Sequence, residues 1–490
     1  MAINVKGSQC ETREARLGSI TTYSGTLQDI GAQSVCSGCL DEKKRCFSQS
    51  SMCNSMCALN QAARINDVAI VHHGPVGCAA TAMDVPNTWG LLADTLGKKR
   101  DNFGWTCTDM TESDTVFGAV DNLKEVIIET YNRYKPKAIF IGASCVSGVI
   151  GEDLEGVLDD LKEQVPVPIA PIHCEGFKSQ IWASGFDATF HAILRYIVKP
   201  PKKKTNKVNV INFAGGTTWD SRGEVKRLFN ALGVEPTFFL ASSSVEELEE
   251  MSEAVATIST CSTLSSYIGN GLEKEYGVPY IRSLQPHGIV GYEDWARKLA
   301  KVLGKEKEAE IFIAQEKEKY QAKIDEVVAK LQGKRAMIAM GPGFGVNYSR
   351  ILQSFGMKVE HLSVWHFDKQ YDDGQLPPAL AYQLEYSEND FSFSVNDLQN
   401  FEYINILNRL VPDILISRHG GTTVWSHKIG IPALNVFDEY TSFGYQGTLR
   451  FAQSVLYAIT NKSFTENLAK RVKLPYKEWS LKQPFDAFIK

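Results

Sequence analysis

Eleven cysteines are the residues of this chain with the most obvious capacity for chemistry, and all of them fall within the first 261 of its 490 residues. In a large cytosolic chain thiols stay reduced, so their roles are metal ligation, catalysis or burial. Cys36 and Cys39 form a CxxC pair that resembles half of a zinc or redox site. Four others are expected to be bystanders or small buried hydrophobes: Cys46, Cys57, Cys107 and Cys174.

The elements that must position these thiols follow an α/β pattern. Short apolar, β-branched runs alternate with amphipathic stretches, which is typical of parallel strands joined by crossover helices. The predicted strands span 67–71, 137–141, 167–172, 207–213, 256–259, 335–340, 358–364, 412–416 and 433–437. Nine strands need several sheets, so we expect three Rossmann-like, doubly wound parallel-sheet units.

Two segments mark boundaries between these units. The charged, proline-bearing stretch 199–207 is typical of a linker, and the predicted strand 207–213 begins at its last residue. The charged helical pattern over 305–331 ends before Gly333, and a further strand follows. The predicted division is an N-terminal arm over 1–45 and α/β units over 46–200, 201–333 and 334–490, the last with a C-terminal tail.

The loops after the strands matter most, because ligands of such sheets bind beyond the carboxyl ends of the strands. Three predicted strands are each followed by a cysteine, in chain order Cys78, Cys145 and Cys261. Cysteines that were only buried in the core would not need to follow strands in this way. A glycine-rich loop from Gly341 to Gly345 follows another strand and would let backbone approach a ligand closely. No GxxxxGK[ST] motif occurs, so we expect no phosphate-binding loop of that type.

Composition excludes several functional classes. The chain has 52 Lys and Arg against 57 Asp and Glu, a formal charge of −5, so it lacks the basic excess that holds nucleic acid or anionic lipid. No apolar run approaches the ~18 residues of a membrane span. The first residues lack the basic-then-apolar order of a secretory signal. We expect a cytoplasmic protein that binds neither nucleic acid nor membrane.

Around the cysteines the sequence resembles the α-subunit of nitrogenase component 1. The matching stretches are Cys53, HHGPVGC at 72–78, SCVSG at 144–148, CEGF at 174–177 and TCSTLSSY at 260–267. The resemblance runs from about residue 45 to about residue 455, and it implies the nitrogenase component 1 fold of three α/β units.

The resemblance also implies two metal clusters and two protein partners. Cys53, Cys78 and Cys145 would hold half of an [8Fe-7S] P-cluster that is shared with a β-type subunit in an α2β2 heterotetramer. Cys261 would bind one end of an [8Fe-9S-C]-type cofactor. An ATP-hydrolysing [4Fe-4S] iron protein would supply electrons. Thiolates on glycine-containing loops suit such clusters, because soft sulfur binds iron and a small neighbour lets backbone approach the bridging sulfides.

Several positions depart from the nitrogenase pattern. Where nitrogen-reducing relatives have a Gln and a His beside the cofactor, this chain has Trp182 and Phe186. Pro86 and Phe344 replace two arginines that support an anionic cluster and its organic acid ligand. We therefore expect an uncharged, apolar pocket and a cofactor without molybdenum and homocitrate.

The second protein ligand of the cofactor is a further departure. Phe437 stands where the family has a histidine ligand, and a phenyl ring cannot bind metal. His419 and His366 follow predicted strands and are the candidate replacements. A hydrogen-bonded structural role stays open for each of them.

These departures favour a nitrogenase-like reductase that acts on a small, weakly polar molecule. The aromatic pair and the cysteine-rich stretch 47–57 most resemble methylthio-alkane reductase, which cleaves the C–S bond of thioethers such as dimethyl sulfide to a thiol and a hydrocarbon. Trp182 and Phe186 lie four residues apart, so a helix core would explain them equally well. Three alternatives stay open: a cofactor-assembly scaffold that resembles the nitrogenase maturase, a dinitrogen-reducing α-subunit, and a tetrapyrrole-reducing relative.

Overall fold

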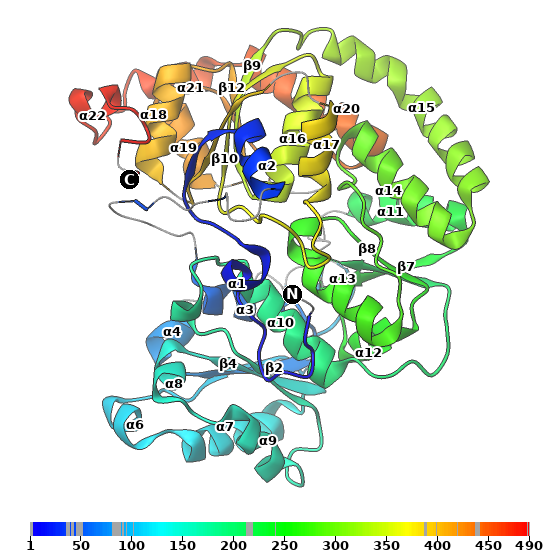
Figure 1. Ribbon diagram of the computed structural model, residues 1–490, viewed down its shortest axis with the longest axis vertical. Coiled ribbons are helices and arrows are strands. Elements are labelled where there is room, and N and C mark those ends of the chain that lie inside the picture. The colour runs from blue at the N-terminus through cyan, green and yellow to red at the C-terminus, as the bar shows by residue number, and fades with distance from the viewer. Residues whose placement is uncertain are drawn as a thin grey trace.

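The structure is a computed structural model that describes the chain outside residues 1–2, 36–39, 41–43, 46–51, 81–89, 91–92, 95, 101, 212–218, 241, 387–389, 398, 419, 437–441, 488 and 490. Its strands form three separate sheets, of four, three and six strands, and helices flank each of them (Figure 1). The predicted α/β fold class is confirmed.

The first sheet is fully parallel and has the order β3-β2-β4-β5. Its strands are β2 (Val68–His73), β3 (Gly104–Cys107), β4 (Ala138–Ala143) and β5 (Ile169–Ile172). Every residue of β2, β4 and β5 is buried, because helices cover both faces. The helices α7 (Val120–Tyr134) and α9 (Leu154–Leu161) pack on one face, and α3 (Asn54–Ala62) and α10 (Ser184–Ala192) on the other.

The second sheet is parallel and has the order β7-β6-β8. Its strands are β6 (Lys207–Ile211), β7 (Glu235–Phe239) and β8 (Ala256–Ser259). The helices that follow these strands are α11 (Trp219–Leu232), α13 (Ser262–Tyr276), α14 (Gly288–Leu303) and α15 (Glu306–Val328). The helix predicted over 305–331 is therefore α15.

The third sheet has the order β1-β11-β10-β9-β12-β13. Its parallel strands are β9 (Arg335–Met340), β10 (Lys358–Val364), β11 (Ser392–Val395), β12 (Ile414–Ser417) and β13 (Ala433–Asn435). The edge strand β1 (Tyr23–Thr26) is antiparallel to β11 and comes from the segment predicted as an N-terminal arm. The helices α16 (Pro342–Ser354) and α20 (Gly444–Thr460) pack on this sheet's core.

All nine predicted strands have a counterpart in the structure, but four strands were not predicted: β1, β3, β7 and β11. They are only four or five residues long and contain glycine, proline or serine, so their sequences lack a clear strand pattern. The boundaries at residues 45, 200 and 333 stay predictions. Across the described part of the chain, no helix combines the length and apolar character needed to cross a membrane.

Candidate functional site

Three exposed thiols lie at the carboxyl edge of the first sheet. Cys53 caps the N-terminus of α3, where its sulfur accepts a hydrogen bond from the Met56 N–H at 3.4 Å. Cys78 lies in α4 (Val76–Ala80), which follows β2, and Cys145 is the first residue of α8 (Cys145–Ile150), which follows β4. All three residues are exposed, whereas free cysteines are usually buried.

Glycines bring these three thiols together. A Cβ atom on Gly176 would lie 3.2 Å from the Cys145 sulfur and 3.5 Å from the Cys53 Cβ, so only glycine leaves this space between them. A Cβ atom on Gly74 would lie 2.4 Å from the Ser144 Cβ, so the loops after β2 and β4 also meet closely. Burial raises the pKa of the Cys78 thiol, and the neighbouring thiols of Cys145 and Cys53 raise it further.

Exposed apolar side chains surround this edge of the sheet. Phe177 follows Gly176 directly, and Phe117, in α6 (Glu112–Phe117), is 85% exposed on a helix that packs against α8. The exposed apolar residues here are Val76, Val116, Phe117, Val149 and Phe177. Exposed thiols among exposed apolar side chains are typical of a surface that another chain covers.

Two histidines next to the thiols lie against carboxylates. The Nε2 atom of His73 pairs with the Glu152 carboxylate, and its Nδ1 lies 3.1 Å from the Thr108 hydroxyl. His173 lies between two carboxylates, 3.0 Å from Glu155 and 3.8 Å from Glu175. Burial alone would lower the pKa of His173, but its hydrogen bonds to these carboxylates outweigh burial and raise the pKa from 6.5 to about 9.

This raised pKa predicts a pH-dependent contribution to stability. Because the folded pKa of His173 lies above the unfolded value, its ion pairs should stabilise the fold fully below pH 6.5 and lose that effect as the pH rises to about 9. We expect His173→Gln to lower the free energy of unfolding by on the order of 1–3 kcal/mol at pH 6.5 and by little above pH 9. Denaturant titrations of both proteins across this range test the prediction, and a constant difference would contradict it.

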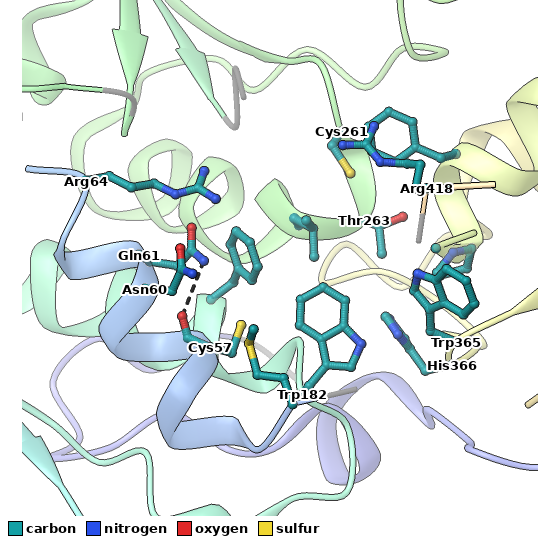
Figure 2. A pocket seen from close by; sticks show the side chains of 17 residues that line it. Cys57, Asn60, Gln61, Arg64, Trp182, Cys261, Thr263, Trp365, His366 and Arg418 are labelled. Carbon is teal, nitrogen blue, oxygen red and sulfur yellow. Dashed lines mark hydrogen bonds between the residues drawn. The ribbon is translucent and has the colours of Figure 1, made fainter. Parts of the chain in front are cut away.

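A cavity of about 230 Å³ lies between the three sheets. Its walls come from α3, from the start of α10, and from the loops after β8, β9, β10 and β12 (Figure 2). The residues that line it are Met52, Cys57, Asn60, Gln61, Arg64, Trp182, Phe186, Cys261, Thr263, Leu264, Gly341, Pro342, Gly343, Phe344, Trp365, His366 and Arg418.

Cys261 brings a buried thiol into this cavity. It follows β8 and precedes α13, with only 2% of its surface exposed, and its N–H donates to the Ser259 hydroxyl at 2.9 Å. The predicted glycine loop is in fact the first turn of α16, with Pro342 at its start, and this turn also lines the cavity. A helix N-terminus favours negative charge, so the first turn of α16 supports an anionic ligand.

Two aromatic side chains and an imidazole form another wall of the cavity. The rings of Trp182 and Phe186 lie edge to face at 6.0 Å, and Trp182 meets the His366 ring at 6.1 Å. Only Phe186 belongs to α10, because Trp182 precedes the first turn of that helix. The structure therefore brings Trp182, Phe186, Cys261 and His366 to one cavity (Figure 2).

The expectation of an uncharged pocket is wrong. Arg64, just after α3, and Arg418, just after β12, both line the cavity. The Arg418 guanidinium lies 3.9 Å from the ring centre of Phe344, the residue that replaces a family arginine, and Arg418 lines the same cavity as Cys261 (Figure 2). Two arginines on other elements therefore line the cavity, although arginine is missing at the two family positions. The family motifs did not reveal these two residues, because neither lies in a motif.

A second cavity of about 250 Å³ adjoins the first and shares Met52, Trp182, Trp365 and His366 with it. Cys53 and Gly176 of the thiol site also line this second cavity. The second cavity therefore lies between the thiol site and the first cavity. Met52, Trp182, Trp365 and His366 form the wall that the two cavities share.

The remaining predicted residues fall into two groups. Those outside the described residues are Cys36, Cys39, Cys46, Pro86, His419 and Phe437. The second group consists of the cysteines expected to be bystanders or buried: Cys57 and Cys174 are buried, and Cys107 is half-buried. Cys57 also lines the cavity, although the sequence predicted no role for it there.

Within the described ranges, no group of three His, Cys, Asp or Glu side chains is spaced to hold one metal ion. A polynuclear cluster spreads its ligands over several irons and does not need that spacing. The thiol site fits such a cluster, because its three thiols are exposed and Gly176 leaves space between two of them. The cavity fits an anionic cluster, because it combines one thiol with two guanidinium groups.

Residues 53–460 match the family described as nitrogenase component 1 type oxidoreductase. The chain is 26% identical over 454 residues to the nitrogenase molybdenum-iron protein alpha chain of Methanosarcina barkeri, with 81% of this chain and 83% of the relative covered. It is 29% identical over 408 residues to the nitrogenase iron-molybdenum cofactor biosynthesis protein NifE of Methanococcus maripaludis, with 81% and 80% covered.

The fold also matches solved structures. The structure titled "Nitrogenase Cp1 at pH 5" superposes with a TM-score of 0.69 at 22% identity, covering 89% of this chain and 94% of that chain. This likeness supports the predicted three-sheet fold.

Proposed function

Because this chain belongs to the nitrogenase component 1 type oxidoreductase family, we propose that it is the α-type subunit of a nitrogenase-like reductase that cleaves C–S bonds. One observation carries the proposal: a cavity with a buried thiol, two cations and an aromatic wall adjoins a surface site with three exposed thiols. Such a pair of sites suits an enzyme that receives electrons at its surface and uses them inside.

The surface site would hold a P-cluster-type [8Fe-7S] cluster. Cys53, Cys78 and Cys145 supply three thiolates, too few for eight irons, so a β-type subunit must supply the rest. The exposed apolar side chains around the thiols support such a subunit interface, in an α2β2 heterotetramer. An ATP-hydrolysing [4Fe-4S] iron protein would bind this assembly and deliver electrons.

The cavity would hold the active-site cofactor. Cys261 would bind one end of an [8Fe-9S-C]-type cluster and His366 would be its second protein ligand, while Arg64 and Arg418 offset its negative charge. When bound, this group would supply low-potential electrons to the substrate. The missing arginines at Pro86 and Phe344 favour a cofactor without molybdenum and homocitrate, whereas Arg64 and Arg418 in the cavity weaken that argument. Metal analysis of the purified complex tests that composition.

The aromatic wall supports a small thioether as substrate. Trp182 and Phe186 offer apolar faces, which make favourable contacts with sulfur. The balanced reaction takes dimethyl sulfide, two electrons and two protons to methanethiol and methane. One C–S bond breaks, the sulfur and the released methyl carbon each gain a proton, and the iron protein provides the electrons.

A cofactor-assembly scaffold is the second candidate, because the similarity to NifE is as extensive as the similarity to the alpha chain. A scaffold would bind a precursor cluster and release it to an acceptor without reducing a thioether. A dinitrogen-reducing subunit is less consistent with these residues, because Phe186 has no polar group where the family has its His, and the Trp182 indole N–H can donate a hydrogen bond but cannot accept and pass on a proton as an imidazole does.

The experiment is an assay of the anaerobically purified complex with its β-type partner and iron protein. We expect methane from dimethyl sulfide, detected by headspace gas chromatography, only in the presence of ATP. A cluster-loaded complex that forms no methane, but transfers its cofactor to a cofactor-free acceptor, would support the scaffold instead. Ammonia formation from dinitrogen at a comparable rate would contradict the proposed specificity.

A further inference from the structure

The imidazole of His366 lies between the cavity and a buried carboxylate. Only 1% of the residue's surface is exposed, and its Nε2 atom lies 3.5 Å from the Asp368 carboxylate. Neither ring nitrogen has a hydrogen-bond partner, although both are buried. Buried polar nitrogens without partners cost free energy, so this imidazole is suited to bind a ligand of the cavity through one nitrogen and to donate through the other.

Asp368 is itself held by two donors. The Ser19 hydroxyl donates to one carboxylate oxygen at 2.6 Å, and Arg13 Nη1 donates to the other at 3.1 Å. Both donors come from the N-terminal segment, Arg13 from α1 (Arg13–Leu17). The side chains of Arg13 and Asp368 are at most 2% exposed, so this carboxylate has a fixed place.

The same guanidinium joins the three walls of the cavity. Arg13 donates two hydrogen bonds to Asp187 in α10, at 2.8 and 2.9 Å, and one to the Thr263 carbonyl in α13, at 2.8 Å. With Asp368 after β10, its partners lie on the segments that carry Phe186, Cys261 and His366. Arg13 therefore fixes the relative positions of these segments.

Three buried carboxylates share two guanidinium groups next to His366. Two guanidinium groups, of Arg13 and Arg16, pair with three carboxylates, of Asp187, Asp368 and Asp372, and all five side chains are at most 3% exposed. A buried carboxylate is costly unless it is paired, and Asp368 shares Arg13 with Asp187. An imidazole N–H that donates to Asp368 would add a partner for this carboxylate.

We propose that Asp368, held by Arg13 and Ser19, is the positioning residue that orients His366 as the second protein ligand of the cofactor. This inference rests on the proposed function. Asp368 lies 3.5 Å from Nε2, so with the cofactor bound Nε2–H would donate to this carboxylate and Nδ1 would be left for iron, the arrangement that commonly supports metal-bound histidines. A purely structural Asp368 would pair with Arg13 as Asp187 does and would have no influence on the cofactor.

Asp187 therefore provides a matched control. Both Asp368→Asn and Asp187→Asn remove a buried carboxylate that pairs with Arg13, but only Asp368 contacts His366. The αβ complex is prepared with ¹⁵N-labelled histidine and loaded with cofactor, and pulsed EPR then measures the coupling of imidazole nitrogen to the paramagnetic cluster. Iron retention against a chelator gives a second readout, and thermal unfolding reports on folding.

We expect nitrogen coupling in the parent and in Asp187→Asn, none in His366→Ala, and an altered coupling in Asp368→Asn with cofactor affinity weakened about 10- to 100-fold. Ser19→Ala removes only the 2.6 Å bond to Asp368 and should shift the coupling in the same direction, which covers the case of a poorly folding Asp368→Asn. Equal effects of Asp368→Asn and Asp187→Asn would overturn the positioning role. A loaded parent without imidazole coupling would overturn His366 as ligand, and a parent that takes up no cofactor would overturn the proposed function itself.

Discussion

Cys261→Ala should empty the cavity of its cofactor while leaving the surface cluster in place. Cys261 lies between β8 and α13, and it lines the same cavity as Arg418 (Figure 2). Thiolate is the preferred ligand of iron in such clusters. We expect thioether reduction to fall by at least about 100-fold, beyond the effect typical of a residue that only supports a ligand. Iron analysis and methane formation measure both effects.

Cys57→Ala is the matched control for this variant. Cys57 is also a buried thiol that lines the same cavity, but it projects from α3 against α10. Its loss should cost roughly 1 kcal/mol of stability from the small void and should leave the cofactor bound. Equal cofactor loss in both variants would show that the cavity is sensitive to any thiol deletion and would contradict a specific role for Cys261.

Cys145→Ala should abolish electron delivery to the cavity. Cys145 begins α8 at the carboxyl end of β4, and Gly176 leaves room for its sulfur beside Cys53. Without this thiolate the shared cluster loses one of three ligands from this chain, so we expect ATP-dependent reduction to fall by at least about 100-fold. Iron per complex should decrease, and size-exclusion chromatography should show weaker association with the β-type subunit.

Cys107→Ala provides the comparison at the same edge of the sheet. Its thiol ends β3, donates to the Gly74 carbonyl at 3.2 Å and accepts from the Asp109 N–H at 3.3 Å. We expect this variant to keep the cluster and the activity, with a small loss of stability. An intact cluster in Cys145→Ala would refute the assignment of the three exposed thiols.

The fold could be predicted well from the sequence because long, apolar strands such as β2 and β4 have unambiguous patterns. The placement of Cys78 and Cys145 after these strands followed directly, since parallel strands end at a common edge. β1 could not be predicted, because YSGT has no strand pattern of its own and pairs only with the distant β11. Its structure depends on tertiary contacts.

The polar part of the cavity was the part that sequence reasoning missed. Arg64 and Arg418 lie 354 positions apart by number, and neither belongs to a recognisable motif. Asp368 was missed as well, although it lies only two residues after His366; a carboxylate so close to a candidate ligand was the available signal. Cations and carboxylates that converge from separate units become apparent only once the sheets are placed together.

The pairing of β1 with β11 has a consequence for how the protein is made. Tyr23 pairs with Val395, and Arg13 reaches Asp368, so the segment that carries these two residues finds its partners only after the much later strands β10 and β11 have been synthesised. These contacts are among the most non-local in the molecule, and their formation is correspondingly slow. The contacts by which Arg13 joins the segments around the cavity therefore form only after β10 has been synthesised.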